Sequence, residues 1–160
     1  MKKFSLLPCI VLIAVALSPQ ARAVTCTVSN TGTAFGVYNP QSASNVTALG
    51  TITVNCTGGF VGEVIPIVIA LNAGVNGTFT GRKMKNAGSS LLTYNLYLDP
   101  TFLLVWGDLT LGTLTLIDTY VLLSTSFSMQ YTVYGVLNGS QTTALPGNYL
   151  DTVVITLSYT

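Results

Sequence analysis

Histidine is absent from this 160-residue sequence, and charged residues of either sign are scarce. Without imidazole, Ser-His-Asp or Cys-His catalysis and His-ligated zinc or haem are excluded. Six Lys plus Arg against five Asp plus Glu are too few for a basic patch that binds nucleic acid, and they leave little for acid/base chemistry. We therefore expect no enzyme, no metal or other cofactor, no nucleic acid and no small-molecule substrate.

Long apolar runs are also rare, and the longest lies at the N-terminus. Lys2 and Lys3 precede an apolar run over residues 4–17, and Ala21-Arg22-Ala23 fits a small-residue cleavage site. As a helix this run would span only about 21 Å, short of the roughly 30 Å hydrocarbon core of a bilayer. The pattern predicts a secretory signal peptide over residues 1–23 and one exported domain over residues 24–160, a length that suits a single core.

Cysteine is sparse as well, and only two cysteines would remain after processing. Cys26 and Cys56 would then lie in an oxidising compartment, where a disulfide is favoured over a thiol pair or a metal site. A bridge that closes a loop of about 31 residues stabilises a fold by roughly 3.5 to 4 kcal/mol in the chain-entropy description. We predict this disulfide, which would connect the first strand to a later one.

The exported part lacks any helical period with caps and is instead rich in short alternating or β-branched segments. Gly and Asn separate these segments, as turns between strands require. Such a series predicts an all-β sandwich or barrel. The expected strands cover residues 24–28, 51–55, 64–71, 92–98, 102–106, 109–116, 119–124, 127–137 and 149–159.

The last expected strand has the clearest pattern. Its alternate apolar residues are predicted to face a core, with small polar residues between most of them: Val153, Ile155, Leu157 and Tyr159. A long apolar strand with a free edge favours aggregation unless another strand pairs with it. We expect either residues 24–28 or a partner chain to cover this edge.

Seven motifs follow one another through the exported part: Phe35-Gly36-Val37-Tyr38-Asn39-Pro40, Ile52-Thr53-Val54-Asn55-Cys56, Arg82 with Met84, Leu92-Thr93-Tyr94-Asn95-Leu96-Tyr97 with Asp99, Trp106-Gly107-Asp108, Tyr134-Gly135, and Gly147-Asn148-Tyr149-Leu150-Asp151-Thr152-Val153. Together they resemble the spore coat protein U domain, which is also the domain of archaic chaperone-usher pilins. The resemblance covers nearly all of residues 26–159. Any one motif is weak, but seven in order are specific.

The resemblance implies an incomplete immunoglobulin-like β-sandwich whose last strand is supplied in trans. A periplasmic chaperone would supply it first, and a neighbouring pilin subunit would replace it at an outer-membrane usher, by β-strand addition. The alternating residues 153–159 would line the acceptor groove, and the two cysteines would be the family disulfide. The implied function is a structural subunit of a pilus or secreted coat, exported through the periplasm to the cell surface.

Some residues depart from the family pattern. Leu109 stands where Gly often follows the Trp-Gly-Asp motif, and Val136 stands where Arg often follows Tyr-Gly. The leucine-rich residues 110–117 are expected to form a buried strand, because large exposed apolar patches are rare on soluble monomers. The basic residues 82–85 are expected to lie on a solvated loop.

The N-terminus suggests a position in the assembly. Cleavage after Ala23 would leave only Val24 and Thr25 before Cys26, and two residues span about 7 Å, too short for a donor strand. We therefore expect a subunit that accepts a strand without donating one, at a filament tip or in a non-polymerising role. Two alternatives stay open: an adhesive tip module, and a secreted coat protein that residues 24–28 complete.

Overall fold

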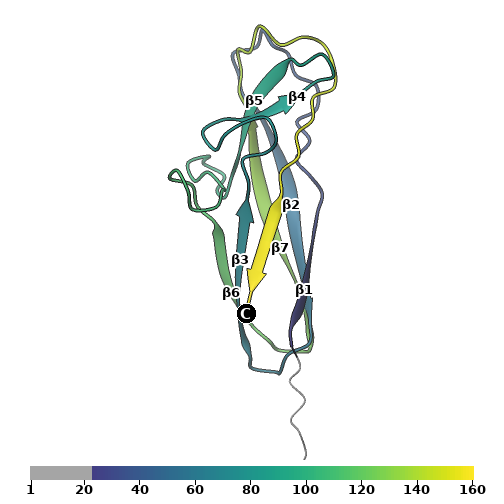
Figure 1. Cartoon of the computed structure of the whole chain (residues 1–160), viewed down its shortest axis with the longest axis vertical. Helices are drawn as coiled ribbons and strands as arrows, with labels where there is room; N and C mark the ends of the chain where they lie inside the picture. The colour runs from purple at the N-terminus through teal and green to yellow at the C-terminus, as the bar shows by residue number, and fades with distance from the viewer. Residues whose placement is uncertain (1–22) are drawn as a thin grey trace, which may run out of the picture.

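The computed structural model of the chain describes residues 23–160 (Figure 1). Residues 1–22 of the predicted signal peptide lie outside the described residues, so the signal and its boundary with the exported domain stay predictions. Every regular element in the described part is a β-strand, and no helix there is long and apolar enough to cross a membrane. The strands are β1 (Thr25–Asn30), β2 (Val46–Thr57), β3 (Val64–Leu71), β4 (Arg82–Lys85), β5 (Leu91–Tyr97), β6 (Leu116–Val121), β7 (Ser126–Leu137) and β8 (Ile155–Tyr159).

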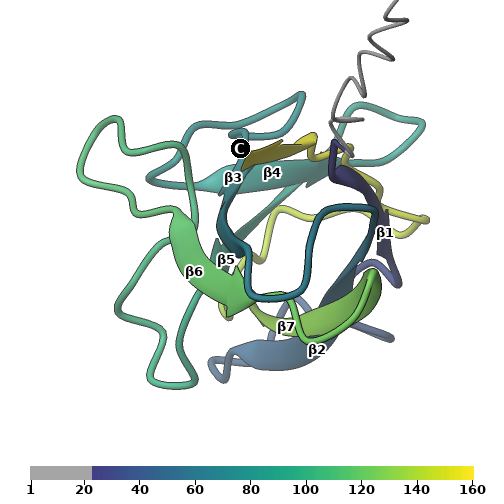
Figure 2. The same ribbon diagram turned by 90° about the horizontal axis from the view of Figure 1, so that it is seen from below.

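The strands form two antiparallel sheets that pack face to face (Figures 1 and 2). The larger sheet has the order β1-β2-β7-β5-β4, and the smaller one has the order β6-β3-β8. The longest ladder of the larger sheet joins β2 to β7 over their full lengths, from Val46 opposite Leu137 to Thr57 opposite Ser126. The predicted all-β, immunoglobulin-like sandwich is confirmed.

The core lies between the inward faces of the two sheets, because alternate residues of each strand point to the same side. The inward side chains of β3 are 0 to 2% exposed, as are those in the second half of β2: Ile65, Ile67, Ile69, Leu71, Ile52, Val54 and Cys56. Trp106 is fully buried with them, and its indole Nε1 donates to the Ile69 carbonyl at 2.9 Å. At roughly 25 cal/mol per Å² of apolar surface, this burial is the main stabilising term.

The predicted disulfide joins Cys26 of β1 to Cys56 of β2, which lie directly opposite each other in the ladder. Cys56 is buried, whereas Cys26 is half-buried at the margin of the core. The bridge therefore fixes the edge strand β1 to the body of the larger sheet.

Two of the predicted strands are wrong. Residues 102–106 and 109–115 form loops with isolated β-bridges. Asp99 accepts hydrogen bonds from three backbone N–H groups that follow it, and these turn the chain away from a strand. Leu109 and Leu111 have φ angles of 72° and 51°, which extended strands do not allow. The leucine-rich segment is exposed rather than buried, with Leu111 at 79%.

The other predicted strands are confirmed with shifted ends. The strand expected at residues 51–55 is longer in the structure and forms β2. The strand expected at residues 119–124 begins and ends earlier in the chain and forms β6. The 149–159 segment shortens to β8 because Leu150 exchanges hydrogen bonds with Lys85 instead, at the edge of β4.

Candidate functional site

The two seams where the sheets meet differ in how they are closed. At the seam between β6 and β7, the Tyr120 and Phe127 rings stack with centroids 4.0 Å apart. Beside them the Tyr131 hydroxyl of β7 donates to the Asp118 carboxylate of β6 at 2.9 Å. Burial and this hydrogen bond raise the pKa of Tyr131. Side chains from both sheets therefore close this seam.

The opposite seam lies between β1 and β8, which do not pair with each other (Figure 2), and we call it the open seam. In residues 23–160, β1 pairs only with β2 and β8 pairs only with β3, so each strand has one free edge. Val28 of β1 lies directly opposite Val54 of β2, on the same face of the sheet. Val54 is completely buried, but Val28 is 37% exposed. An inward-facing valine thus meets solvent for lack of a neighbouring strand.

The last strand shows the same asymmetry. Its inward residues pair with β3 residues that are 0 to 2% exposed, yet they are only half-buried themselves: Ile155 opposite Leu71, Leu157 opposite Ile69, and Tyr159 opposite Ile67. Val153 continues this row and is also half-buried against the core. Thr156 and Ser158 point outward and are exposed. The alternation read from the sequence is present, and it leaves a strip of core partly open to water.

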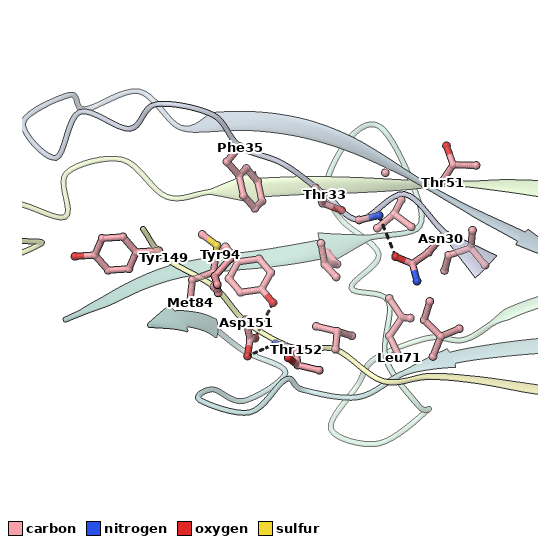
Figure 3. A pocket seen from close by; sticks show the side chains of 18 residues that line it. Asn30, Thr33, Phe35, Thr51, Leu71, Met84, Tyr94, Tyr149, Asp151 and Thr152 are labelled. Carbon is pink, nitrogen blue, oxygen red and sulfur yellow. Dashed lines mark hydrogen bonds between the residues drawn. The ribbon is translucent and has the colours of Figure 1, made fainter. Parts of the chain in front are cut away.

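Above the two edge strands, the open seam widens into a groove. A cavity of about 330 Å³ lies between the chain that follows β1 and the chain that precedes β8 (Figure 3). A second cavity of about 750 Å³ shares part of its lining with the first, so the two are neighbours and are treated together. We call the pair the seam groove. Its apolar walls include Phe35, Leu71, Met84, Tyr94, Tyr149, Val153 and Ile155.

Phe35 and the residues before it form one wall of the groove. They pack directly on β2 and β7 because each of these strands has a glycine, without a side chain, at the point of contact. A side-chain carbon at Gly135 of β7 would lie 2.5 Å from Thr33 and 2.9 Å from the Phe35 ring. One at Gly50 of β2 would lie 2.6 Å from the Gly32 carbonyl oxygen. The Phe35 ring then meets Tyr94 edge-on, with centroids 5.8 Å apart. The Tyr-Gly motif thus provides room for the Phe-Gly motif.

A tyrosine–aspartate pair fixes the opposite wall of the groove. The Tyr94 hydroxyl donates to Asp151 Oδ2 at 2.7 Å (Figure 3). Asp151 Oδ1 accepts from the backbone N–H groups of Val75 and Thr152, both at 2.9 Å. Burial, and then the hydrogen bond to Asp151, raise the pKa of Tyr94 well above its ordinary value. The pair connects β5 to the chain that leads into β8.

Arg82 corrects the expectation of a solvated basic loop, since it begins β4 and is fully buried. Its guanidinium donates to the Asn72 carbonyl at 3.1 and 2.8 Å, to Asn95 Oδ1 at 2.6 Å and to the Trp106 carbonyl at 2.7 Å. It also lies 5.5 Å from the Phe79 ring centroid. Desolvation lowers the pKa of Arg82, partly offset by the nearby Tyr94 and Asp151. The guanidinium of the motif arginine therefore binds neutral groups of the fold.

The other motif residues hold loops around the groove. Tyr38 donates from its hydroxyl to the Asn138 carbonyl at 2.8 Å, and the Tyr149 hydroxyl contacts Ser90 Oγ at 2.8 Å. Tyr97 lies opposite Tyr134 in the β5–β7 ladder and meets Phe102 edge-on at 5.8 Å. The remaining motif residues lie in turns. Gly36 and Gly147 have φ angles of 72° and 152°, and Gly147 lies beside Asn86. Gly107 packs against Thr113, and the exposed Asp108 accepts a hydrogen bond from the Thr110 N–H.

Sequence reasoning missed the second wall of the open seam. Phe35 lines the groove and was not expected there. Residues 24–28 were expected to cover the edge of the last strand, but among the described residues β1 pairs with β2 alone, so Val28 borders the open seam and the edge of β8 stays uncovered. The signal was present in β1, where Cys26 and Val28 alternate with threonine and serine. Only the pairing of β1 with β2 shows that this row faces the same gap as β8.

Comparison with known proteins agrees with this architecture. A structure of the CsuC–CsuE chaperone–tip adhesion subunit pre-assembly complex, from archaic chaperone-usher Csu pili of Acinetobacter baumannii, shares the fold with a TM-score of 0.53 and 17% identity. The match covers 84% of this chain and 39% of that chain, so the present chain spans about two fifths of its neighbour's length.

Sequence comparison identifies the family. Protein U of Myxococcus xanthus is 34% identical over 137 residues, which cover 78% of this chain and 70% of that protein. The sequence profile of the Spore Coat Protein U domain matches residues 12–156. The resemblance read from the seven motifs is therefore confirmed, and the chain belongs to the Spore Coat Protein U domain family.

Proposed function

We propose that this chain is a structural subunit of a chaperone-usher pilus or a related surface coat, completed by a donor strand from another protein. The observation that carries the proposal is the contrast between the two seams. One is closed by aromatic stacking and a Tyr131–Asp118 hydrogen bond, whereas the other leaves Val28 37% exposed beside two unpaired strand edges. Family membership and the fold shared with the Csu complex support it.

The donor strand would lie between β1 and β8. Free backbone groups on the two edges would pair with it, and alternate apolar side chains of the donor would enter the groove. Its apolar side chains would cover the inward row of β8, and those nearest the upper cavity would meet Phe35 and Tyr94. This role is structural, and the motif residues support the groove instead of performing chemistry.

The partners follow from an incomplete fold. A strip of exposed core needs cover from the moment of export, because it would otherwise pair with other edges. A periplasmic chaperone would provide that cover, and an outer-membrane usher would exchange it for a neighbouring subunit's strand. The mature protein would then reside at the cell surface in a pilus or coat.

The test uses two adjacent residues of β8 that face opposite ways. Leu157 is half-buried and packs against the core beside the open seam, whereas Ser158 is exposed and points outward. The chain is purified from the periplasm of its own cells, co-purifying chaperone is identified by mass spectrometry, and surface delivery is scored. Leu157→Asp should abolish chaperone binding and delivery, and Ser158→Asp should preserve both. Equal behaviour of the two variants would contradict the proposal.

The acceptor-only position is part of the same proposal. If cleavage follows Ala23, β1 begins two residues into the mature chain at Thr25, and Cys26 is already fixed by the disulfide. Nothing of donor length is then free at that end. N-terminal sequencing of the mature protein should give Val24 as the first residue, and the purified protein should form no homopolymer ladder. Ladders from a chain that starts near Val24 would refute this position.

An adhesive tip role is the second candidate, and the exposed leucines favour it. Leu103, Leu109 and Leu111 are 78%, 61% and 79% exposed on two loops that protrude beside β6 (Figure 2). Such side chains could bury apolar area against a hydrophobic surface. Replacing the three by asparagine should reduce attachment of cells to polystyrene without reducing surface delivery. Unchanged attachment would remove this candidate.

A further inference from the structure

Strand β3, in the middle of the smaller sheet, is apolar on both faces, although only one of them is covered. The inward row of β3 is 0 to 2% exposed. The outward row consists of Val64, Pro66, Val68 and Ala70, which are exposed or half-buried. A strand that is apolar on both faces is typical of sheets covered on both sides. The sequence of β3 thus fits a sheet with a second partner on its outer face.

The neighbouring strand β6 continues this outer surface. Val121 lies opposite Val64, Ile117 lies opposite Val68, and Thr119 sits between them opposite Pro66. Val64 is 55% exposed, Ile117 is 70% exposed and Val121 is 48% exposed. We call the outward residues of β3 and β6 the outer apolar face. It lies on the side of the smaller sheet away from the core and the groove.

No charge opposes the meeting of this face with itself. Asp118 is the one charged residue in β3, β6 and β8, and it points to the inner side, where its carboxylate accepts from Tyr131. Glu63, just before β3, folds back to accept from the Phe60 N–H at 2.9 Å. In a two-fold contact the same patch appears on both subunits, so an uncharged patch avoids like-charge repulsion.

The size of the face limits it to a weak contact. Eight residues of β3 and one strand spacing on each side give a flat area of roughly 250 Å², against about 800 Å² per partner in a standard interface. Exposed apolar side chains flank the two strands in the chain and would add area to the contact: Leu123 after β6, and Phe60 and Val61 before β3. We therefore propose that the outer apolar face joins two copies of this chain, sheet against sheet.

The contact is independent of the groove, since Thr119 and its neighbours lie on the other side of the smaller sheet from Leu157. It would link subunits sideways, while a donor strand would link them end to end. An area this small is typical of weak, transient contacts, so we expect dimers only at high protein concentration. The two kinds of contact can therefore be tested separately.

Sedimentation equilibrium of the purified exported chain tests the proposal. It compares two single substitutions, one in each sheet. Thr119 lies in the outer apolar face, and Thr132 is exposed at the middle of β7 on the larger sheet. The wild-type chain and Thr132→Lys should both form dimers at tens to hundreds of micromolar. Thr119→Lys should be monomeric, because it would bring two ammonium groups into an apolar contact. A monomeric wild type, or a Thr119→Lys variant that still dimerises, overturns the inference.

A second variant keeps the test decisive if lysine at position 119 disturbs folding. Val64→Thr together with Val121→Thr keeps the β-branched shape and adds polarity at one cross-strand pair. The dimer dissociation constant should rise at least about tenfold, since two methyl groups per subunit are replaced by hydroxyls that the contact would desolvate. No change in that constant would overturn the inference. Donor-strand binding by these variants should be normal, so failure here would leave the groove proposal intact.

Discussion

A strand added behind Thr160 should stabilise the chain only when its apolar side chains face the groove. We would join an eight-residue strand to Thr160 through an Asn-Gly turn, which favours a two-residue hairpin and fixes its register. The even-numbered side chains of the added strand would then lie opposite Tyr159, Leu157, Ile155 and Val153. One version has valine at these positions and threonine between them, and its control exchanges the two sets.

The two versions have the same composition, chain entropy and backbone hydrogen bonds, so their difference measures side-chain burial alone. Fully burying one valine is worth about 1.5 kcal/mol, so four fully buried valines would give about 6 kcal/mol. Because the β8 residues opposite them are already half-buried, we expect about 3 kcal/mol or more in the free energy of unfolding.

Urea unfolding followed by Trp106 fluorescence gives this difference, since Trp106 is fully buried in the native fold. The melting temperature should differ by roughly 10 °C between the two strands for a domain of this size. The reasoning fails if both versions stabilise the chain equally, or if neither raises its stability above that of the unextended protein. Either result would mean that the seam does not accept a strand in the inferred register.

Three further perturbations test the framework around the groove. Cys26→Ala should lower the free energy of unfolding by roughly 3.5 kcal/mol, read from the urea midpoint, and reduction of the wild type should match it. Arg82→Met should cost about 3 to 5 kcal/mol in the same assay, because it leaves the Asn72 and Trp106 carbonyls without their donor, and Arg82→Lys should recover little. Tyr94 has a raised pKa, so the unfolded chain loses this proton first above pH 10 and stability should fall by up to about 1.4 kcal/mol per pH unit. Tyr94→Phe should show a shallower alkaline decline, and an unchanged slope would argue against the buried Tyr94–Asp151 pair.

The local sequence pattern was enough to predict the strands whose two faces differ in polarity. The alternation in residues 153–159 identified the side of β8 that faces the core, and β3 and β7 came out nearly at their true bounds. The seven motifs identified the family because they form a fixed set of contacts, such as Phe35 over Gly135 and Tyr94 on Asp151. Both kinds of information are local in sequence or depend on residue type.

The errors arose where long-range contacts override local preference. Arg82 stands among lysines in a basic run, and its burial depends on acceptors from residues 72, 95 and 106, which only the fold brings together. The leucines of residues 109–115 suggest a strand, yet the turn that follows Asp99 and the positive φ angles keep them in an exposed loop.

The sequence by itself determined the all-β class, the disulfide and the apolar row of the last strand, because strand alternation and cysteine pairing follow from residue type and spacing. Only the tertiary structure decided which seam is open. That outcome depends on strand order: β6 meets β7 through paired aromatic rings, whereas β1 and β8 end as separate edges with half-exposed core side chains between them. Strand order in turn reflects pairings between residues far apart in sequence, which no local pattern encodes.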